Sequence, residues 1–369
     1  MIPSVSGGVG HISRTGVLAR ALRRLDPGVS VEYVLDAGRL RPFNIAAVMQ
    51  MGYRPRLLPA RTRDNRDAVA QACLDDADVI VDDSMRYLVP LRACLPRAAW
   101  VSVPMYPVGD ELFDDWPCLE QTDAVIWAYA PLVERPAELD LVADKLAVTG
   151  PFLDMGEVPE REAARAALGI TAPFVAYAPR GFPFGLIFGH RALHAAIEGV
   201  AALRRGAHPE LQLHLMAVKN PGELRGIAGV PDTLPDWVVV HGLAPQAEAL
   251  ARMRAADILL AEGSSTMHEG ASLGTPMVLI PGPIAETLNL ARALARHRGA
   301  HSVEPDDTTP EALARAFAAV LDDRTEAAAM AARARAAVTV GGGAEAAAQL
   351  VLRVAAEHRA RRAARGEAV

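Results

Sequence analysis

Cysteine is scarce in this sequence. Only Cys73, Cys94 and Cys118 occur among 369 residues, and none of them forms a CxxC pair or stands at metal-ligand spacing from a histidine. This set is too small and too scattered for a disulfide framework or a structural zinc site. We therefore expect a core held by packing alone, without a structural metal.

Excess positive charge and long apolar runs are also missing. The 38 Lys and Arg residues are outnumbered by 44 Asp and Glu residues, which leaves a formal net charge of −6. No basic field is available to collect nucleic acid. No stretch approaches the roughly 20 apolar residues of a transmembrane helix, and the first residues lack the basic and apolar parts of a secretion signal. We expect a cytoplasmic protein with, at most, peripheral membrane contact.

What the sequence does contain is an alternation of short apolar runs with longer segments of helical period, which is typical of βα units around parallel sheets. The length suggests about two domains. The first series of expected strands is 3–6, 31–35, 79–82, 100–103, 124–129 and 146–149. The second series is 174–178, 211–217, 238–241, 258–261, 277–280 and 301–303. The expected helices are 15–25, 68–75, 191–205, 247–255, 267–273, 310–321 and 344–365.

A stretch that contains Pro and Glu, Asp154–Glu162, separates the two series and is interpreted as a linker. We predict an α/β protein with one doubly wound domain in residues 1–150, a second in 151–343, and a C-terminal helix in 344–369 that packs back on the first. The basic end of that helix, HRARRAARG, is interpreted as solvated, with a site for anionic lipid headgroups as the alternative.

A glycine-rich turn follows the first expected strand. Gly8 and Gly10 allow a ligand to approach the backbone closely and leave helix N–H groups available to an anion. The turn does not match the dinucleotide fingerprint, because the third glycine and the ribose-binding acid about 20 residues later are both missing. NAD binding is therefore disfavoured. A phosphate or an acceptor remains the expected ligand, and the alternative is a turn that only allows tight helix packing.

His11 directly follows these glycines, at the carboxyl end of a strand, where open α/β sheets bind their ligands. An imidazole there is a candidate general base, or it caps the loop. Asp82 and Asp83 end another strand, and Asp83 is the candidate partner that orients the base; the alternative is a solvated loop. Ser84 is a possible helix cap, and Arg14 is either an anion clamp or a solvated surface residue.

The most informative segment runs from Ala256 to Pro281: strand, Gly263-Ser264-Ser265-Thr266 loop, short helix, Gly274-x-Pro276, strand. Hydroxyls and N–H groups at a helix N-terminus favour a pyrophosphate without any metal. Glu269, one turn into the helix, is placed to accept hydrogen bonds from ribose hydroxyls. We interpret His268 and Met267 as packing residues of the same helix.

This segment resembles the donor-binding region of GT-B nucleotide-sugar glycosyltransferases, both the UDP-glycosyltransferases and the family of the N-acetylglucosaminyltransferase that forms lipid II. Gly263, Thr266, Glu269, Gly274, Pro276, Met277, Val278 and Pro281 match the family pattern. Further matches are Gly242–Gln246 for the segment that holds the nucleobase and Gly150-Pro151 before the linker. Gly10-His11 matches the catalytic base of the family, and Asp83 matches its partner. The resemblance implies two Rossmann-like domains facing a cleft.

The resemblance also implies which residues hold the donor. Leu243 and Gln246 would contact the nucleobase, and Glu269 would contact the ribose. The diphosphate would be bound by Gly263, Ser264, Ser265 and Thr266, and the sugar by Glu286 and Asn289. The sequence departs from the family at Ala261, which replaces a diphosphate-contacting histidine, and at Leu243, which replaces a base-stacking tryptophan. Arg180 is a candidate replacement for the histidine, or simply a surface residue in a turn.

Taken together, these matches predict an inverting, metal-independent glycosyltransferase. It would move a sugar from a UDP- or dTDP-sugar to a hydroxyl of a small molecule, natural product or lipid-linked sugar, with His11 as the base and no cofactor. Two alternatives stay open. One is a nucleotide-sugar hydrolase of the same fold, which the pattern Gly8-x-Gly10-His11-x-x-Arg14 also fits, with an epimerase as a weaker variant. The other is a catalytically silent partner of another enzyme.

Overall fold

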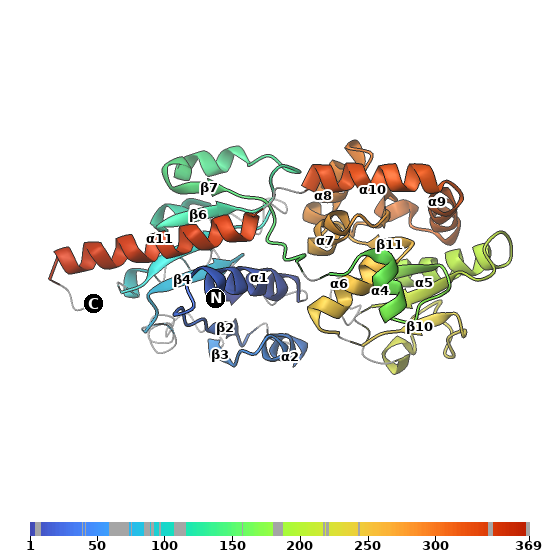
Figure 1. Ribbon diagram of the computed structural model, residues 1–369, viewed down its shortest axis with the longest axis horizontal. Helices are drawn as coiled ribbons and strands as arrows, with labels where there is room; N and C mark the ends of the chain where they lie inside the picture. Colours follow the sequence, from blue (N-terminus) through green and yellow to red (C-terminus); the bar gives the residue numbers. More distant parts are fainter. Residues whose placement is uncertain are drawn as a thin grey trace. The chain divides into compact units, whose positions relative to one another are not determined.

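The structure is a computed structural model that describes residues 1–3, 9–38, 40, 42–58, 74, 76–84, 89, 92–95, 97–106, 116–156, 158–179, 187–216, 218, 221–242, 244–338 and 342–366. The chain divides into two compact units. The first unit consists of Met1–Asp154 and Val340–Val369, and the second of Met155–Thr339. Figure 1 shows their elements along the chain.

The first unit contains a parallel five-stranded sheet of order β1-β4-β5-β6-β7 and a separate parallel pair, β2 and β3. Its strands are β1 (Ile2–Pro3), β2 (Tyr33–Asp36), β3 (Pro55–Leu58), β4 (Val79–Asp83), β5 (Ala99–Val103), β6 (Ala124–Trp127) and β7 (Leu146–Val148). Its helices are α1 (Gly10–Leu25), α2 (Pro42–Gln50) and α11 (Gly343–Ala364), with 3-10 helices at Trp116–Gln121 and Ala137–Lys145.

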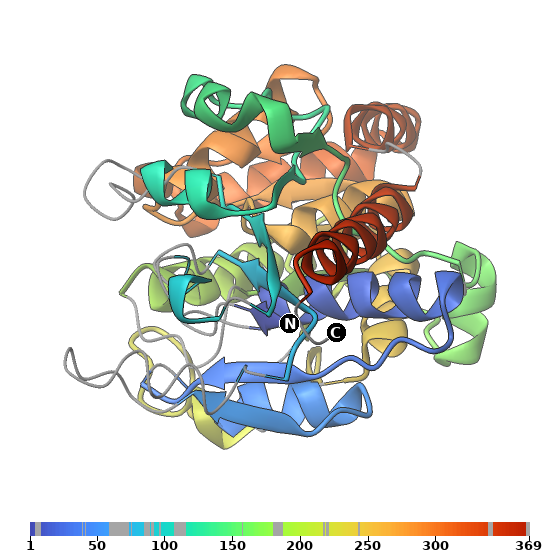
Figure 2. The same cartoon turned by 90° about the vertical axis from the view of Figure 1, so that its left-hand side faces the viewer.

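Helices α1 and α11 pack side by side within this unit, as Figure 2 shows. Val17, Leu18 and Leu22 of α1 share one apolar cluster with Ala347 and Val351 of α11. Burying these side chains together removes apolar surface from water, which stabilises the docking of the last helix. The helix joins the first unit although it follows the second in sequence.

The second unit has a parallel six-stranded sheet of order β10-β9-β8-β11-β12-β13. Numbered within the unit this is 3-2-1-4-5-6, the strand order of a Rossmann fold. Its strands are β8 (Phe174–Ala178), β9 (Gln212–Leu215), β10 (Val238–Val240), β11 (Ile258–Ala261), β12 (Met277–Leu279) and β13 (His301–Ser302). Its helices are α4 (Arg161–Ala167), α5 (Ile187–Arg204), α6 (Gln246–Ala255), α7 (Ser265–Leu273), α8 (Ala285–Arg296), α9 (Pro310–Asp322) and α10 (Arg324–Val338), with 3-10 helices at Pro221–Leu224 and Pro305–Asp307.

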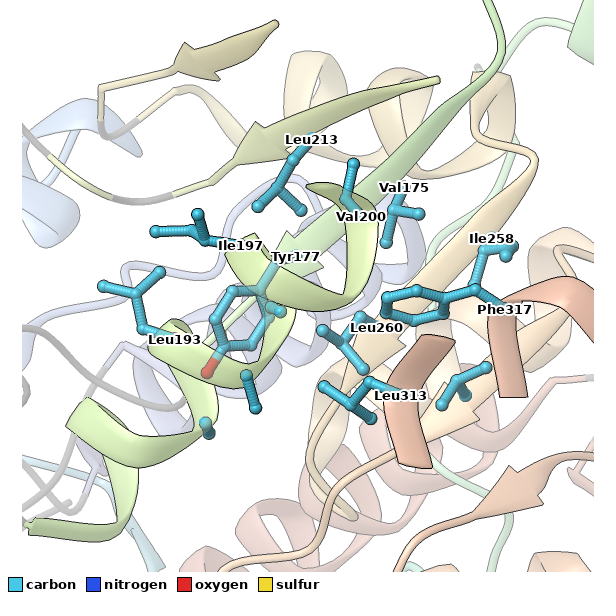
Figure 3. Close-up of a cluster of buried hydrophobic side chains, with 14 of the residues drawn as sticks. Val175, Tyr177, Leu193, Ile197, Val200, Leu213, Ile258, Leu260, Leu313 and Phe317 are labelled. Carbon is cyan, nitrogen blue, oxygen red and sulfur yellow. The ribbon is translucent and has the colours of Figure 1, made fainter. Parts of the chain in front are cut away.

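The core of the second unit lies between its sheet and helices α5 and α9 (Figure 3). Val175 of β8 and Leu260 of β11 face Ile197 of α5 and Phe317 of α9 in one buried cluster. Buried strands of a parallel sheet are apolar on both faces, which is why their short runs were recognisable in the sequence.

Several elements differ from the sequence-based expectations. The predicted linker Asp154–Glu162 was too long, because α4 begins at Arg161. The sequence did not predict strand β3 or helices α2, α8 and α10. Most of the predicted helix 68–75 lies outside the described residues.

The basic end of α11 was predicted to be solvated, but two of its arginines contact the first unit. Arg362 is 7% exposed, and its guanidinium donates to the carbonyl oxygen of Arg97 at 3.5 Å. Arg361 donates to the Asp123 carboxylate at 3.2 Å. The helix end is therefore tied to the first unit by polar contacts. Among the described residues, no helix combines the length and the apolar character needed to cross a bilayer.

Candidate functional site

Strand order brings His11 and Asp83 together in the first unit. Strand β1 pairs directly with β4, and Pro3 stands opposite Asp83 in their register. After β1 the chain passes through α1 to β2, whose Val34 N–H donates to the Met1 carbonyl at 2.9 Å, whereas after β4 it continues to β5 on the other side. Such a reversal creates a switch point, where α/β sheets bind ligands. Helix α1 begins here, with His11 in its first turn, and Asp83 is the last residue of β4.

The two side chains are in contact although they are 72 residues apart in sequence. His11 Nδ1 lies 3.1 Å from Asp83 Oδ1. The His11 side chain is 25% exposed, whereas that of Asp83 is 0% exposed. Because a carboxylate only accepts hydrogen bonds, this contact favours the imidazole tautomer with the proton on Nδ1 and a lone pair on Nε2. A partly exposed imidazole of this kind can accept a proton from a bound hydroxyl.

Arg14 is the third member of this cluster, and it is not the solvated surface residue that was considered. Its Nε donates to Asp83 Oδ2 at 2.9 Å, and its Nη2 contacts Asp83 Oδ1. Burial acts to raise the pKa of Asp83, but the charges of Arg14 and His11 outweigh it and hold that pKa well below its usual range. Asp83 is therefore ionised. The Arg14 guanidinium, which the sequence offered as an anion clamp, is paired with this carboxylate.

Two further side chains border the cluster. Ser84 Oγ donates to Asp83 Oδ1 at 3.1 Å, from a residue with a positive φ of 62°. Tyr129 was missed in the sequence: its hydroxyl lies 3.5 Å from Arg14 Nη1, and its ring packs against Tyr106 and Trp127. Its position beyond the end of β6 was the available signal, but its approach to Arg14 depends on the order of strands in the sheet.

The second unit has its own switch point, between β8 and β11. The residues after β11 form a tight loop, in which the Ser264 N–H donates to the Glu262 carbonyl at 2.8 Å, and α7 begins at Ser265. The side chains of Ser264, Ser265 and Thr266 are half-buried at this helix start. Free N–H groups and hydroxyls at a helix N-terminus form a site that suits an anion.

Gly263 has a packing role in this loop. A Cβ atom added there would lie 2.0 Å from the backbone oxygen of Thr287, in the first turn of α8. The missing side chain therefore lets α8 approach the loop. Helix α8 carries Glu286, which is buried, and Asn289, which is half-buried.

Glu269 and Gln246 are hydrogen-bonded to each other between α7 and α6. Glu269 is half-buried, and loss of hydration raises the pKa of its carboxyl to about 7, while the bond from Gln246 acts in the opposite direction. A carboxyl that titrates near neutrality is a common feature of binding sites.

Of the other predicted residues, some are described by the structure and some lie outside the described part of the chain. Gly10 is the first residue of α1. Met267 and His268 are buried in α7, as predicted for packing residues, and His268 Nδ1 lies 3.3 Å from the Ser264 carbonyl. Gly8, Arg180 and Leu243 lie outside the described residues.

Comparison with known proteins places this geometry in context. Residues 244–354 match the model of the glycosyltransferase family 28 C-terminal domain. A UDP-N-acetylglucosamine--N-acetylmuramyl-(pentapeptide) pyrophosphoryl-undecaprenol N-acetylglucosamine transferase from Acidiphilium cryptum (strain JF-5) is 37% identical over 138 residues. This match spans 36% of the present chain and 36% of that relative.

Solved structures match over almost the whole chain. The glycotransferase of kitacinnamycin has a TM-score of 0.61 at 20% identity, covering 96% of this chain and 97% of the other. A candidate UDP-N-acetylglucosamine 2-epimerase from Listeria monocytogenes has a TM-score of 0.65 at 14% identity, covering 94% and 93%. At these identities the likeness is one of fold, which different reactions share. The chain therefore has the GT-B fold with two Rossmann-like domains, and residues 244–354 resemble the C-terminal domain of family 28 glycosyltransferases.

Proposed function

We propose that this protein is an inverting glycosyltransferase that moves a sugar from a nucleoside diphosphate sugar to an acceptor hydroxyl. The observation that carries the proposal is the 3.1 Å contact between His11 Nδ1 and the ionised Asp83. It supports His11 as the general base of the reaction. The similarity of residues 244–354 to a glycosyltransferase domain supports a nucleotide-sugar donor.

In the proposed reaction, His11 Nε2 removes the proton of the acceptor hydroxyl as its oxygen attacks the anomeric carbon. The bond from that carbon to the diphosphate oxygen breaks, and the nucleoside diphosphate leaves with its electron pair. Asp83 keeps the imidazole oriented and stabilises the imidazolium that forms. Attack from the side opposite the leaving group inverts the anomeric configuration.

We assign the donor to the second unit. Ser264, Ser265 and Thr266, at the N-terminus of α7, would stabilise the charge that develops on the diphosphate, so no metal is required. Glu269 would accept hydrogen bonds from the ribose, Gln246 would hold the base, and Glu286 and Asn289 would contact the sugar. Arg180 and Leu243 remain predicted donor contacts, and Gly8 and Gly10 remain predicted contacts on the acceptor side.

The acceptor is assigned to the first unit, where His11 lies. The Acidiphilium cryptum relative acts, by its name, on an undecaprenol-linked substrate, which favours a lipid-linked sugar and peripheral contact with the cytoplasmic membrane face. A natural product is the alternative, since the kitacinnamycin enzyme has the same fold. The nucleobase of the proposed donor is uracil or thymine.

A two-stage experiment tests this function. Thermal-shift measurements with UDP, dTDP, GDP and their sugars identify the nucleotide, because a ligand that binds the folded state raises its melting temperature. The matching radiolabelled sugar is then incubated with lipid and small-molecule acceptor pools. We expect label in an acceptor. Free sugar formed without any acceptor would instead indicate the hydrolase, and nucleotide binding without turnover would indicate a silent partner.

A further inference from the structure

The Asp83 carboxylate is held by more groups than a base and its partner require. Oδ1 lies 3.1 Å from both His11 Nδ1 and Ser84 Oγ, and Arg14 Nη2 contacts the same oxygen. Oδ2 accepts from Arg14 Nε at 2.9 Å. Arg14 therefore contacts both oxygens of a side chain that is fully buried. It has no part in the proton transfer proposed above.

The geometry of this pair fixes the plane of the carboxylate. A guanidinium presents its N–H groups as a planar fork that matches two carboxylate oxygens at once, which a lysine ammonium cannot do. With both oxygens held, Oδ1 is directed at His11 Nδ1. Without Arg14, the contacts of His11 and Ser84 would hold Oδ1 alone, and the carboxylate would be able to rotate and lose that direction.

The same arrangement bears on the proton of His11. Arg14 Nη2 lies 3.3 Å from His11 Nδ1. Arginine only donates hydrogen bonds, so donation to Nδ1 would require the tautomer with the proton on Nε2, which cannot act as a base there. Nη2 lies closer to Asp83 Oδ1 than to His11 Nδ1, which favours donation to the carboxylate instead.

We propose that Arg14 is a positioning residue that acts through Asp83: it orients the carboxylate so that His11 carries its proton on Nδ1 and keeps Nε2 as the acceptor. The consequence for the reaction rate rests on the proposed function. The consequence for the tautomer does not, and it is measurable in the protein without any substrate.

The tautomer is read from the ¹⁵N chemical shifts of the His11 ring, assigned by their loss in His11→Gln. We expect the Nδ1–H tautomer in the wild type and a mixture of tautomers in Arg14→Lys and Arg14→Met. With the identified donor, we expect kcat of both variants to fall by about 10- to 100-fold, the range that a misplaced catalytic group can cost, with the donor KM unchanged.

Two comparisons separate positioning from a general loss of structure. Adding Arg14→Met to Asp83→Asn is expected to lower kcat no further than Asp83→Asn alone, because the arginine acts through the aspartate. Arg20→Met removes another arginine of α1, which pairs with Asp154 at 3.0 Å, and is expected to change neither the tautomer nor kcat. Arg14→Lys keeps the positive charge and decides the question if Arg14→Met fails to fold.

Three results would overturn the proposal. One is an unchanged Nδ1–H tautomer in both Arg14 variants. Another is an additive loss of kcat in the double variant. The third is weaker UDP or dTDP binding with kcat unchanged, which would make Arg14 an anion-binding residue. If no transferase activity exists at all, the proposed function fails, while the tautomer measurement still decides the role of Arg14.

Discussion

Asp257 shows how a buried charge is stabilised away from the candidate site. Its carboxylate, 4% exposed, accepts from Arg161 at 2.7 Å, from Arg324 at 2.9 Å and from the Phe174 N–H at 3.0 Å. It thereby connects α4 and α10 to the amino end of β8. Burial acts to raise the pKa of Asp257, but the Phe174 N–H and the arginines outweigh it and lower that pKa.

We predict that Asp257→Asn lowers the free energy of unfolding by about 3 kcal/mol, because it leaves buried donors without their charged acceptor. Since the folded-state pKa is lowered, this contribution is present at neutral pH and is lost as the pH falls below about 4. Urea unfolding at pH 7 and at lower pH measures both effects. As a control, Glu304→Gln removes an exposed partner of Arg292 and should cost far less, because exposed ion pairs contribute little to stability. Equal costs for the two variants would contradict this account.

Glu269 predicts a pH dependence of nucleotide binding. Its carboxyl has a pKa of about 7, and the ionised form is the better acceptor for ribose hydroxyls. If only that form binds, affinity should fall by about tenfold from pH 8 to pH 6. Calorimetric titration with UDP measures it, and Glu269→Gln, which keeps the shape of the side chain, should lose this dependence. The nucleotide's own phosphate titration is common to both proteins, so an identical slope in both would contradict the assignment.

At the scale of elements, the close approach of α8 to the loop after β11 depends on Gly263. We predict that Gly263→Ala displaces α8, because the added methyl group would meet a backbone oxygen that cannot move by itself. The variant should lose about 1–3 kcal/mol of stability and bind the donor more weakly, since α8 carries Glu286 and Asn289. Thermal unfolding and donor titration measure the two effects.

Gly274, at the other end of α7, provides the matched control. Its φ is +70°, and an added Cβ would meet nothing within 4 Å. Gly274→Ala should therefore cost about 1–2 kcal/mol through backbone strain alone and leave donor affinity unchanged. A Gly263→Ala variant that bound the donor as well as Gly274→Ala does would show that α8 takes no part in the donor site.

At the scale of the whole molecule, the strands were predictable where they are buried apolar runs, as with Phe174–Ala178 and Ile258–Ala261, which the structure reproduces. Strand β3 was not, because it begins with a proline and is only partly buried. Helix α10 was missed because its alanines and arginines define no clear apolar face in the sequence. Burial of one side becomes evident only after it packs.

The candidate site was predictable in part for the same reason. A histidine after one strand and an aspartate after another are visible in sequence, and the βα alternation indicates that such ends gather at one edge. The sequence does not contain the strand order that makes β1 and β4 neighbours and brings Tyr129 toward Arg14. Nor does it contain the burial that raises the pKa of Glu269.

The two assigned roles should be separable by mutation. Because His11 belongs to the first unit and Glu269 to the second, we predict that His11→Ala strongly lowers turnover with no change in UDP or dTDP affinity. Glu269→Ala should weaken nucleotide binding while the His11 ring keeps its tautomer. Titration calorimetry and the ¹⁵N shifts of His11 measure the two effects. Loss of nucleotide binding in His11→Ala would contradict the division of roles.

The most direct test of the central claim is the acceptor-dependent rate of nucleoside diphosphate release, measured for the wild type and His11→Ala at saturating donor. We predict release that depends on the acceptor and falls by about 10²- to 10⁴-fold in the variant, the usual contribution of a general base. An equal rate in the two proteins, or release that does not depend on an acceptor, would contradict the claim that His11 activates an acceptor hydroxyl.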